Sequence, residues 1–195
     1  MAKVQAPLFG LGARNSIGQA VTYFPWKGLN VVRKYVIPAN PNTTLQAAQR
    51  ALMTAAVLAF HTALYTAGDM IAWNRLSGTL AKTMTGFNAM VRRHILEAIA
   101  GNTWELLTNV FSNGVLVDRF AVWCTKESGG NAPTVHYGTS KTFMPGTQIM
   151  ADQFGNSWRG TPLGLSADTL YFFYIDVGTT GVDYARTGIY QQRTS

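Results

Sequence analysis

The sequence contains a single cysteine, Cys124, so no disulfide can form within the chain of 195 residues. A chain without disulfides is suited to folding in a reducing compartment. The neighbouring residues Val122, Trp123 and Thr125 have the composition of a strand. We therefore expect Cys124 to be a buried apolar side chain and not a reactive thiol.

Charge is also scarce: only 13% of the residues are charged, whereas 47% are hydrophobic. This composition supplies enough apolar material for a core and too little charge for a disordered chain. The surface must then consist largely of uncharged polar side chains, or other subunits cover part of it. Charged residues are depleted in the centre of protein interfaces, which makes the second reading attractive.

Acidic residues are few, with 9 Asp and Glu against 16 Lys and Arg, and the net charge is +7. A basic balance of this kind is compatible with nucleic acid as a partner. The basic residues are scattered, however, and Arg92-Arg93 is only a pair. No run approaches the basic clusters of about five to eight residues that mark nucleic-acid patches. We therefore treat nucleic acid as a less favoured partner.

Long hydrophobic runs are missing, and no stretch approaches the roughly 18 apolar residues of a transmembrane helix. The first residues, 1–7, also lack the apolar stretch of a signal peptide. We expect no membrane partner.

Catalytic motifs are absent as well. The three histidines, His61, His94 and His136, are isolated from one another. The sequence contains no G-x-S-x-G elbow and no Walker-type loop, and Gly10-Leu11-Gly12 lacks the remaining spacing of a dinucleotide loop. We expect no enzymatic activity, no cofactor and no metal.

The first part of the chain predicts a Gly-rich arm over 8–14, a β-hairpin over 16–37 and then helices. Pro25-Trp26-Lys27-Gly28 is the expected turn of the hairpin, and Pro38–Pro41 is expected to end it. A first helix is expected over 43–66, with Leu45, Ala48, Leu52, Ala55, Ala56 and Ala59 on one apolar face. Gly68 is its expected end, Asp69 is expected to cap a second helix, and a third is expected over 87–100.

From about residue 115 the sequence predicts an antiparallel β-sandwich, because short alternating runs lie between Gly- and Pro-containing turns. Strands are expected at 116–125, 134–137, 148–152, 158–163, 169–177 and 184–191. The fold class is therefore α+β. We place a domain boundary between residues 1–112, which hold the arm, hairpin and helices, and residues 113–195, which hold the sandwich. The aromatic run 171–174 alternates between two faces, so one aromatic face is expected to be exposed or covered by another subunit.

The segment Leu163–Ile175 resembles the entry into the sixth strand of fibronectin type III (Ig-like) domains. The resemblance spans about residues 115–195 and implies that Leu165 and Tyr171 pack at the edge of the sandwich. It includes Pro133–Ser140 as a third strand and Tyr184–Tyr190 as a last strand. The first strand of that family is not evident, and the hairpin over 16–37 is a candidate to complete the sheet in its own chain or in a neighbour.

Residues 14–75 resemble a group of short phage and prophage proteins through the pattern W-K-G … R … P-x-N-P-x-T … Q … Q-R. In this sequence the pattern comprises Trp26-Lys27-Gly28, Arg33, Pro38–Pro41, Thr43, Gln46 and Gln49-Arg50. The resemblance implies a virion-associated protein, assembled in the host cytoplasm, whose partners are other virion proteins and further copies of itself.

Within this pattern, Trp26, Lys27, Arg33 and Arg50 are candidate interface residues, because Trp and Arg are frequent anchors of interfaces. The alternative is that the same residues only lock the hairpin to the helix. Trp158 in the sandwich is a further candidate.

The sequence thus favours a non-enzymatic structural protein of a bacteriophage particle, serving as a head decoration, a head–tail joining protein or a tail component. Two alternatives stay open. The aromatic strand and Trp158 are compatible with a carbohydrate- or host-surface-binding module on a fibre, and the net charge of +7 is compatible with a DNA-associated virion protein.

Overall fold

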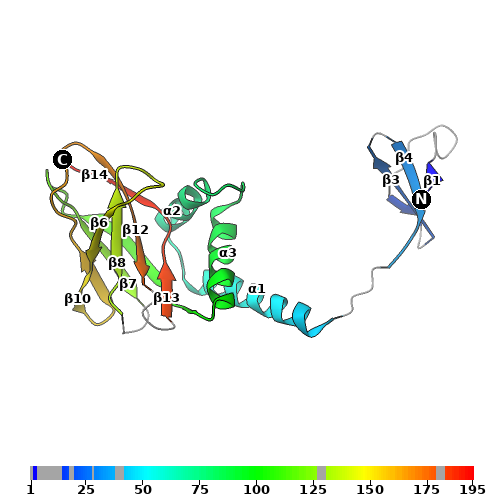
Figure 1. The fold of residues 1–195 in the computed structure, drawn as a ribbon, viewed down its shortest axis with the longest axis horizontal. Coiled ribbons are helices and arrows are strands. Elements are labelled where there is room, and N and C mark those ends of the chain that lie inside the picture. The colour runs from blue at the N-terminus through cyan, green and yellow to red at the C-terminus, as the bar shows by residue number, and fades with distance from the viewer. Residues whose placement is uncertain are drawn as a thin grey trace. The chain divides into compact units, whose positions relative to one another are not determined.

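The computed structural model describes residues 2–3, 15–17, 20–27, 29–37, 42–126, 131–178 and 183–195. The fold is α+β, as the sequence predicted, with helices beside antiparallel sheets (Figure 1). The chain divides into two compact units, Met1–Thr43 and Thr44–Ser195. The predicted arm over 8–14 and the proline corner over 38–41 lie outside the described residues.

The first unit is a four-stranded antiparallel sheet that contains the predicted hairpin. Its strands are β1 (Ala2–Lys3), β2 (Asn15–Ile17), β3 (Val21–Trp26) and β4 (Leu29–Lys34), in the order β1-β4-β3-β2. The hairpin strands therefore pair with β1 and β2 in a sheet of their own. The predicted turn was too long, because Pro25 and Trp26 still pair with Asn30 and Leu29, and Lys27 follows them with a φ of 49°.

The second unit contains a sandwich of two sheets. One sheet has the order β10-β11-β7-β6, from β6 (Leu107–Asn113), β7 (Ala121–Lys126), β10 (Ala151–Phe154) and β11 (Ser157–Gly160). The other has the order β5-β13-β12-β8-β9, and β14 also pairs with β12. Its strands are β5 (Thr103–Trp104), β8 (Thr134–Gly138), β9 (Gly146–Ile149), β12 (Leu170–Val177), β13 (Asp183–Arg186) and β14 (Tyr190–Arg193).

Strand β6 is the largest difference from the sequence prediction. It pairs with β7 and places Leu107 and Val110 in the core, although residues 107–113 were not recognised as a strand. The register of β6 shifts between Thr108 and Phe111, and this irregularity interrupts the two-residue alternation by which strands are recognised. The expected domain boundary between residues 112 and 113 falls inside this strand, whereas the chain divides into units after Thr43.

Two predicted strands are each divided in the structure. The strand expected over 148–152 breaks at the buried Met150, where the chain leaves β9 of one sheet and enters β10 of the other. The strand expected over 184–191 breaks at residues 187–189 into β13 and β14, which pair with different halves of β12. Between β13 and β14, the Thr187 hydroxyl accepts a hydrogen bond from the Ile175 amide (3.0 Å). That amide therefore has a partner although the backbone ladder is interrupted there.

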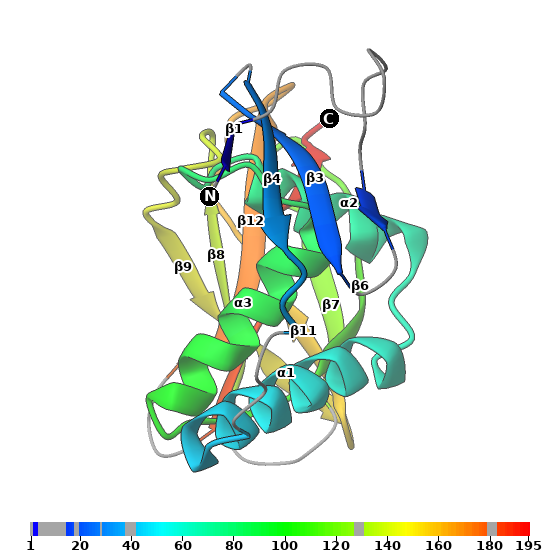
Figure 2. The same ribbon diagram turned by 90° about the vertical axis from the view of Figure 1, so that its right-hand side faces the viewer.

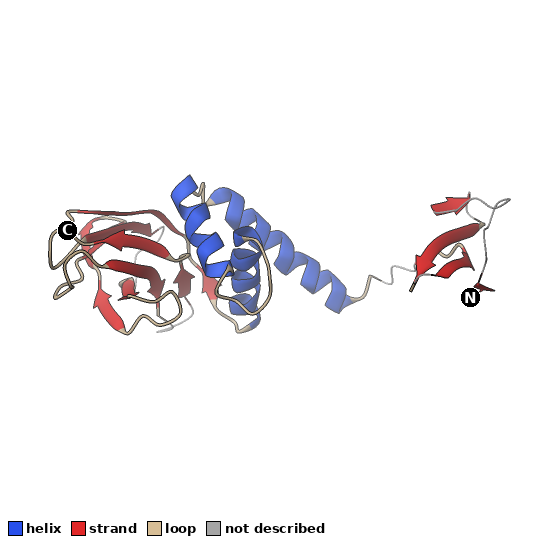
Figure 3. Ribbon diagram, turned by 90° about the horizontal axis from the view of Figure 1, so that it is seen from above, coloured by secondary structure: helices blue, strands red, loops and turns tan. Residues whose placement is uncertain are grey.

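Strand β12 is covered on both faces. Tyr171, Phe173 and Ile175 belong to the core between the two sheets, whereas Phe172 packs in a second cluster with helix residues. The expectation of an exposed aromatic face is therefore wrong for residues 171–173. The helices form a layer beside the sheets, on the outer side of the sheet that holds β12 (Figures 2 and 3).

Three helices form this layer: α1 (Thr44–Thr62), α2 (Ala67–Ser77) and α3 (Gly86–Ile99). Helix α2 begins earlier than predicted, because Thr66 is its N-cap and Asp69 completes a capping box three residues later. Gly68, the predicted end of the first helix, lies inside α2. The chain instead leaves α1 through Leu64, whose φ is 48°.

Helix α2 approaches two other segments unusually closely, and a glycine lies at each contact. A Cβ atom added at Gly188, between β13 and β14, would lie 2.3 Å from the carbonyl carbon of Ala72. One added at Gly86, the start of α3, would lie 2.7 Å from the amide nitrogen of Asn74. Hydrogen bonds join the same contacts, from the Ile189 amide to the Ala72 carbonyl (2.9 Å) and from the Gly86 amide to Asn74 Oδ1 (2.7 Å).

Asp69 provides a second connection between α2 and the sheet. Its side chain is only 1% exposed and accepts hydrogen bonds from the Thr66 amide (2.8 Å) and the Tyr190 hydroxyl. The carboxylate thus stabilises the start of α2 and satisfies a buried hydroxyl of β14. Burial beside this carboxylate raises the pKa of the Tyr190 hydroxyl, which therefore stays protonated as a donor.

We expect Gly188→Ala to lower the free energy of unfolding by about 2–3 kcal/mol, because the new methyl group forces α2 away from the sheet. Chemical denaturation followed by circular dichroism measures this change. The control is Gly178→Ala, since a Cβ at Gly178 meets no atom within 4 Å and the residue has no positive φ. Equal stability of the two variants would refute the close-packing argument.

We also expect Cys124 to be unreactive in the folded protein. It is 2% exposed, and burial raises the pKa of its thiol to about 12. A thiol reagent such as 5,5′-dithiobis(2-nitrobenzoic acid) should react with it only after denaturant is added. Rapid stoichiometric labelling without denaturant is the result that this burial does not allow.

Candidate functional site

The predicted interface residues of the first unit lie on its hairpin. Trp26 is 56% exposed at the end of β3, and Lys27 and Arg33 are exposed as well. The Arg33 guanidinium lies 5.2 Å from the centre of the Phe24 ring. Arg50 belongs to the other unit, where it is exposed on α1. The hairpin thus carries exposed aromatic and basic side chains.

Trp158 does not belong to any such surface. It is 8% exposed and packs in the core between the two sheets. The alternation of β11 places Trp158 inward and its neighbour Arg159 outward, above the Trp123 ring at 5.4 Å. The prediction of Trp158 as an interface residue is therefore wrong, because its side chain packs inward, in the core between the sheets.

An exposed apolar surface of the second unit lies on α1. Every residue from Thr44 to Ala51 is exposed, and the Leu45 side chain is 79% exposed. Further along the same helix, Ala56 is completely buried against the other helices. The middle of α1 is therefore packed, and its first turns are exposed within the second unit.

An apolar groove lies beside the packed part of α1. It has a volume of about 440 Å³ and is lined by Met53 of α1, by Met84 and by the α3 residues Asn88, Val91, Arg92, Ile95 and Leu96. Most of these side chains are aliphatic or thioether groups. Such a groove can accept the apolar face of another helix.

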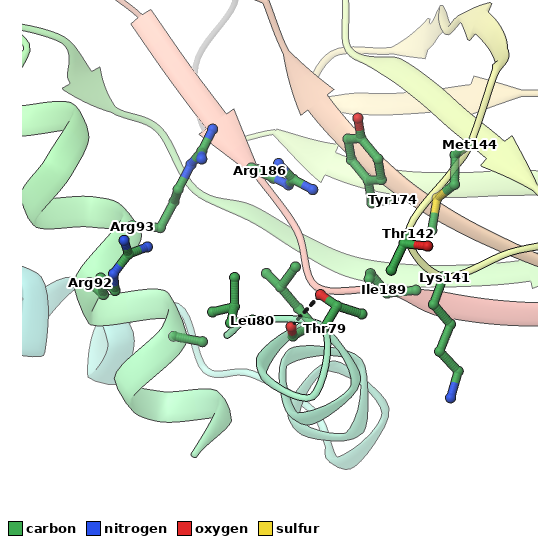
Figure 4. Close-up of a pocket in the computed structure, with 12 residues that line it drawn as sticks. Thr79, Leu80, Arg92, Arg93, Lys141, Thr142, Met144, Tyr174, Arg186 and Ile189 are labelled. Carbon is green, nitrogen blue, oxygen red and sulfur yellow. Dashed lines mark hydrogen bonds between the residues drawn. The ribbon is translucent and has the colours of Figure 1, made fainter. Parts of the chain in front are cut away.

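A second cavity, of about 330 Å³, lies between the helices and the sheet (Figure 4). Four basic side chains line it: Arg92 and Arg93 of α3, Arg186 of β13, and Lys141 of the loop between β8 and β9. The residues that line it include no acidic side chain. We refer to it as the basic pocket.

Tyr174 of β12 forms part of the wall of the basic pocket. The Arg186 guanidinium lies 4.1 Å from the centre of its ring, and the His136 ring on β8 stacks on it at 4.7 Å. His136 Nε2 lies 2.9 Å from the carboxylate of Asp176. Burial raises the pKa of the Tyr174 hydroxyl, and Arg186 opposes that rise. The hydroxyl is therefore a protonated donor near neutral pH.

The basic pocket was not predicted from the sequence. Arg92 and Arg93 were noted as a pair, but Lys141 and Arg186 lie far from them in the chain. Only the pairing of β12 with β13, and the packing of α3 beside them, brings these four residues together.

Within the described ranges, no three His, Cys, Asp or Glu residues are arranged to hold a metal ion. Among the helices that the structure describes, none is both long and apolar enough to cross a membrane. Lys126 and Glu105 form a buried ion pair (3.0 Å) that joins β7 to the segment before β6.

Comparisons with known proteins add little. No protein-family model and no curated protein matches the sequence. Among solved structures, the sensor domain of the anti-sigma factor RsgI4 from Pseudobacteroides cellulosolvens is similar in part. It is 12% identical, and the overlap covers 46% of this chain and 93% of that one at a TM-score of 0.33. A likeness of this size does not bear on function.

We expect Trp158→Ala to act on stability and not on binding, because the side chain fills the core. The variant should lose about 3–5 kcal/mol of unfolding free energy, as large core truncations do. Trp26→Ala, at an exposed tryptophan, serves as the control and should leave the unfolding of the sandwich unchanged. Denaturant titrations of both variants make the comparison, and a fully stable Trp158→Ala protein would contradict the packing described above.

Proposed function

We propose that this chain is a non-enzymatic structural component of a bacteriophage particle, and that it assembles through contacts between copies of itself. Its roles as a head decoration, a head–tail joining protein or a tail component all depend on such contacts. The observation that carries the proposal is the exposed apolar end of α1.

The exposed end of α1 continues the face by which the same helix packs within its own chain. Leu45, Ala48, Leu52 and Ala56 follow one another at intervals of three and four residues, and therefore lie on one face. Ala56 is buried, Leu52 is half-buried, and Leu45 and Ala48 are exposed. Within the second unit, no described residue buries the first turns of this apolar face.

A second copy of the chain is the partner that fits this face best. The face already packs against α2 and α3 in its own chain, so the groove beside α3 in another copy offers surroundings of the same chemistry. Within α1, Arg50 is the only Lys, Arg, Asp or Glu, and it lies off the apolar face. The apolar face of α1 can therefore enter the groove without bringing a charged side chain of its own into the contact.

The resemblance of residues 14–75 to phage and prophage proteins supports placing this assembly in a virion. The exposed Trp26, Lys27 and Arg33 of the hairpin then offer a further contact surface for other virion proteins. The carbohydrate-binding alternative has less support, since Trp158 and the aromatic residues 171–173 on which it depended are buried.

We expect the full chain to form a defined oligomer that Leu45→Glu/Leu52→Glu dissociates, because the new carboxylates would be desolvated in the contact. Sedimentation equilibrium gives the masses. The control is Leu163→Glu/Leu170→Glu, which introduces the same two charges at sandwich leucines that are 55% and 39% exposed. A wild-type chain that stays monomeric at high concentration would refute the self-assembly part of the proposal.

The virion part has a separate test. Quantitative mass spectrometry of purified particles should detect the chain in many copies per particle. Its absence from particles, in cells that express it, would rule out the virion assignment even if the chain self-associates.

A further inference from the structure

The basic pocket has an excess of positive charge that the chain itself does not neutralise. Within the described part of the chain, Arg92, Lys141 and Arg186 form no ion pair. Arg93 differs, because its Nε lies 3.2 Å from the Glu97 carboxylate and its guanidinium donates to the Tyr184 hydroxyl. Three cations thus line one cavity of about 330 Å³ without a counter-ion from its wall.

Arg186 is the most informative of the three cations. Its Nε is buried and has no hydrogen-bond partner, although buried donors are nearly always satisfied. The residue directly across the ladder is Asp176, a natural partner for an arginine. The Asp176 carboxylate instead pairs with His136 on the other side of β12. Asp176 is therefore engaged with His136, and Arg186 forms no ion pair among the described residues.

The position of Arg186 is also defined before any ligand arrives. Its guanidinium lies 4.1 Å from the centre of the Tyr174 ring. His136 of the neighbouring strand β8 stacks on that ring and restrains it. In Figure 4 the guanidinium extends toward Tyr174, and Arg92 and Arg93 lie on the helix that faces it. Thr142 and Tyr174 line the same cavity, and their hydroxyls can donate hydrogen bonds. The Thr79 hydroxyl already donates to the Leu76 carbonyl (2.7 Å) and can only accept.

We propose that the basic pocket binds the phosphate group of a small phosphorylated molecule, with Arg186 and Arg92 as its principal ligands. Guanidinium groups match the geometry of phosphate oxygens and bind them through paired hydrogen bonds. A phosphate dianion neutralises more of the excess charge than a single carboxylate. The cavity volume lies at the lower end of the range for small-molecule sites, about 300–1,000 Å³, so the recess suits a small ligand better than a polymer backbone.

The basic pocket and the groove beside α3 share Arg92, but Arg186 and Tyr174 of the pocket lie on strands of the sandwich and do not line the groove. The Arg186→Gln variant therefore tests the pocket separately from the proposed assembly through α1.

The test is isothermal titration calorimetry of the full chain at low ionic strength, with inorganic phosphate and adenosine 5′-monophosphate as separate probes. We expect binding of at least one probe, weakened about tenfold or more in Arg186→Gln, since a charge-assisted hydrogen bond contributes at least that factor. Arg92→Gln should weaken it as well. Arg92 is exposed on α3, so this variant keeps the test valid if Arg186→Gln fails to fold.

The matched control is Arg159→Gln, which removes the same charge from the outer face of the other sheet. Affinity should be unchanged in this variant. Binding of the nucleotide but not of inorganic phosphate would identify the phosphate as part of a larger ligand. Equal weakening in Arg159→Gln and Arg186→Gln would mean a general attraction to a basic surface and would overturn the proposal. Failure of both probes to bind at millimolar concentration would also overturn it, as would binding of single-stranded DNA that neither probe displaces.

Discussion

The packing of α2 between two glycines is the constraint on which the second unit depends. Gly188 allows the segment between β13 and β14 to touch the backbone of the helix at Ala72, and Gly86 allows α3 to begin against Asn74. The backbone hydrogen bond from Ile189 to Ala72 can form only at this short range. Asp69 strengthens the same junction, because one buried carboxylate serves both the N-terminus of α2 and the Tyr190 hydroxyl.

This junction explains the two faces of β12. Once α2 and α3 are held against the outer side of the sheet, Phe172 packs with the helices while Phe173 packs between the sheets. The break between β13 and β14 follows from the same contact, since the chain must leave the ladder at residues 187–189 to meet α2. Outside this packed region, Tyr174 and Arg186 line the basic pocket.

The division of α1 into a packed and an exposed part links the fold to the proposed assembly. Its apolar face runs from Leu45 to Ala59, but only the later residues reach α2 and α3. A face of this length is costly to leave in water, because each exposed leucine forgoes about 2 kcal/mol of burial energy. The proposed contact with another copy would recover that energy without a change in the rest of the unit.

By itself, the sequence determined the elements whose signals are local. The spacing of apolar residues located the three helices, and alternation between turns located most strands of an α+β fold. The isolation of Cys124 in a strand-like run correctly indicated a buried thiol. The tertiary structure alone decided the features that depend on contacts between distant segments. Strand β6 carries an irregular register, so only its pairing with β7 identifies it. The sequence alone did not show which face of its strand Trp158 occupies, and only the pairing and packing of β11 place its side chain in the core. The basic pocket joins α3, β13 and the loop after β8, and no local pattern connects residues so far apart along the chain.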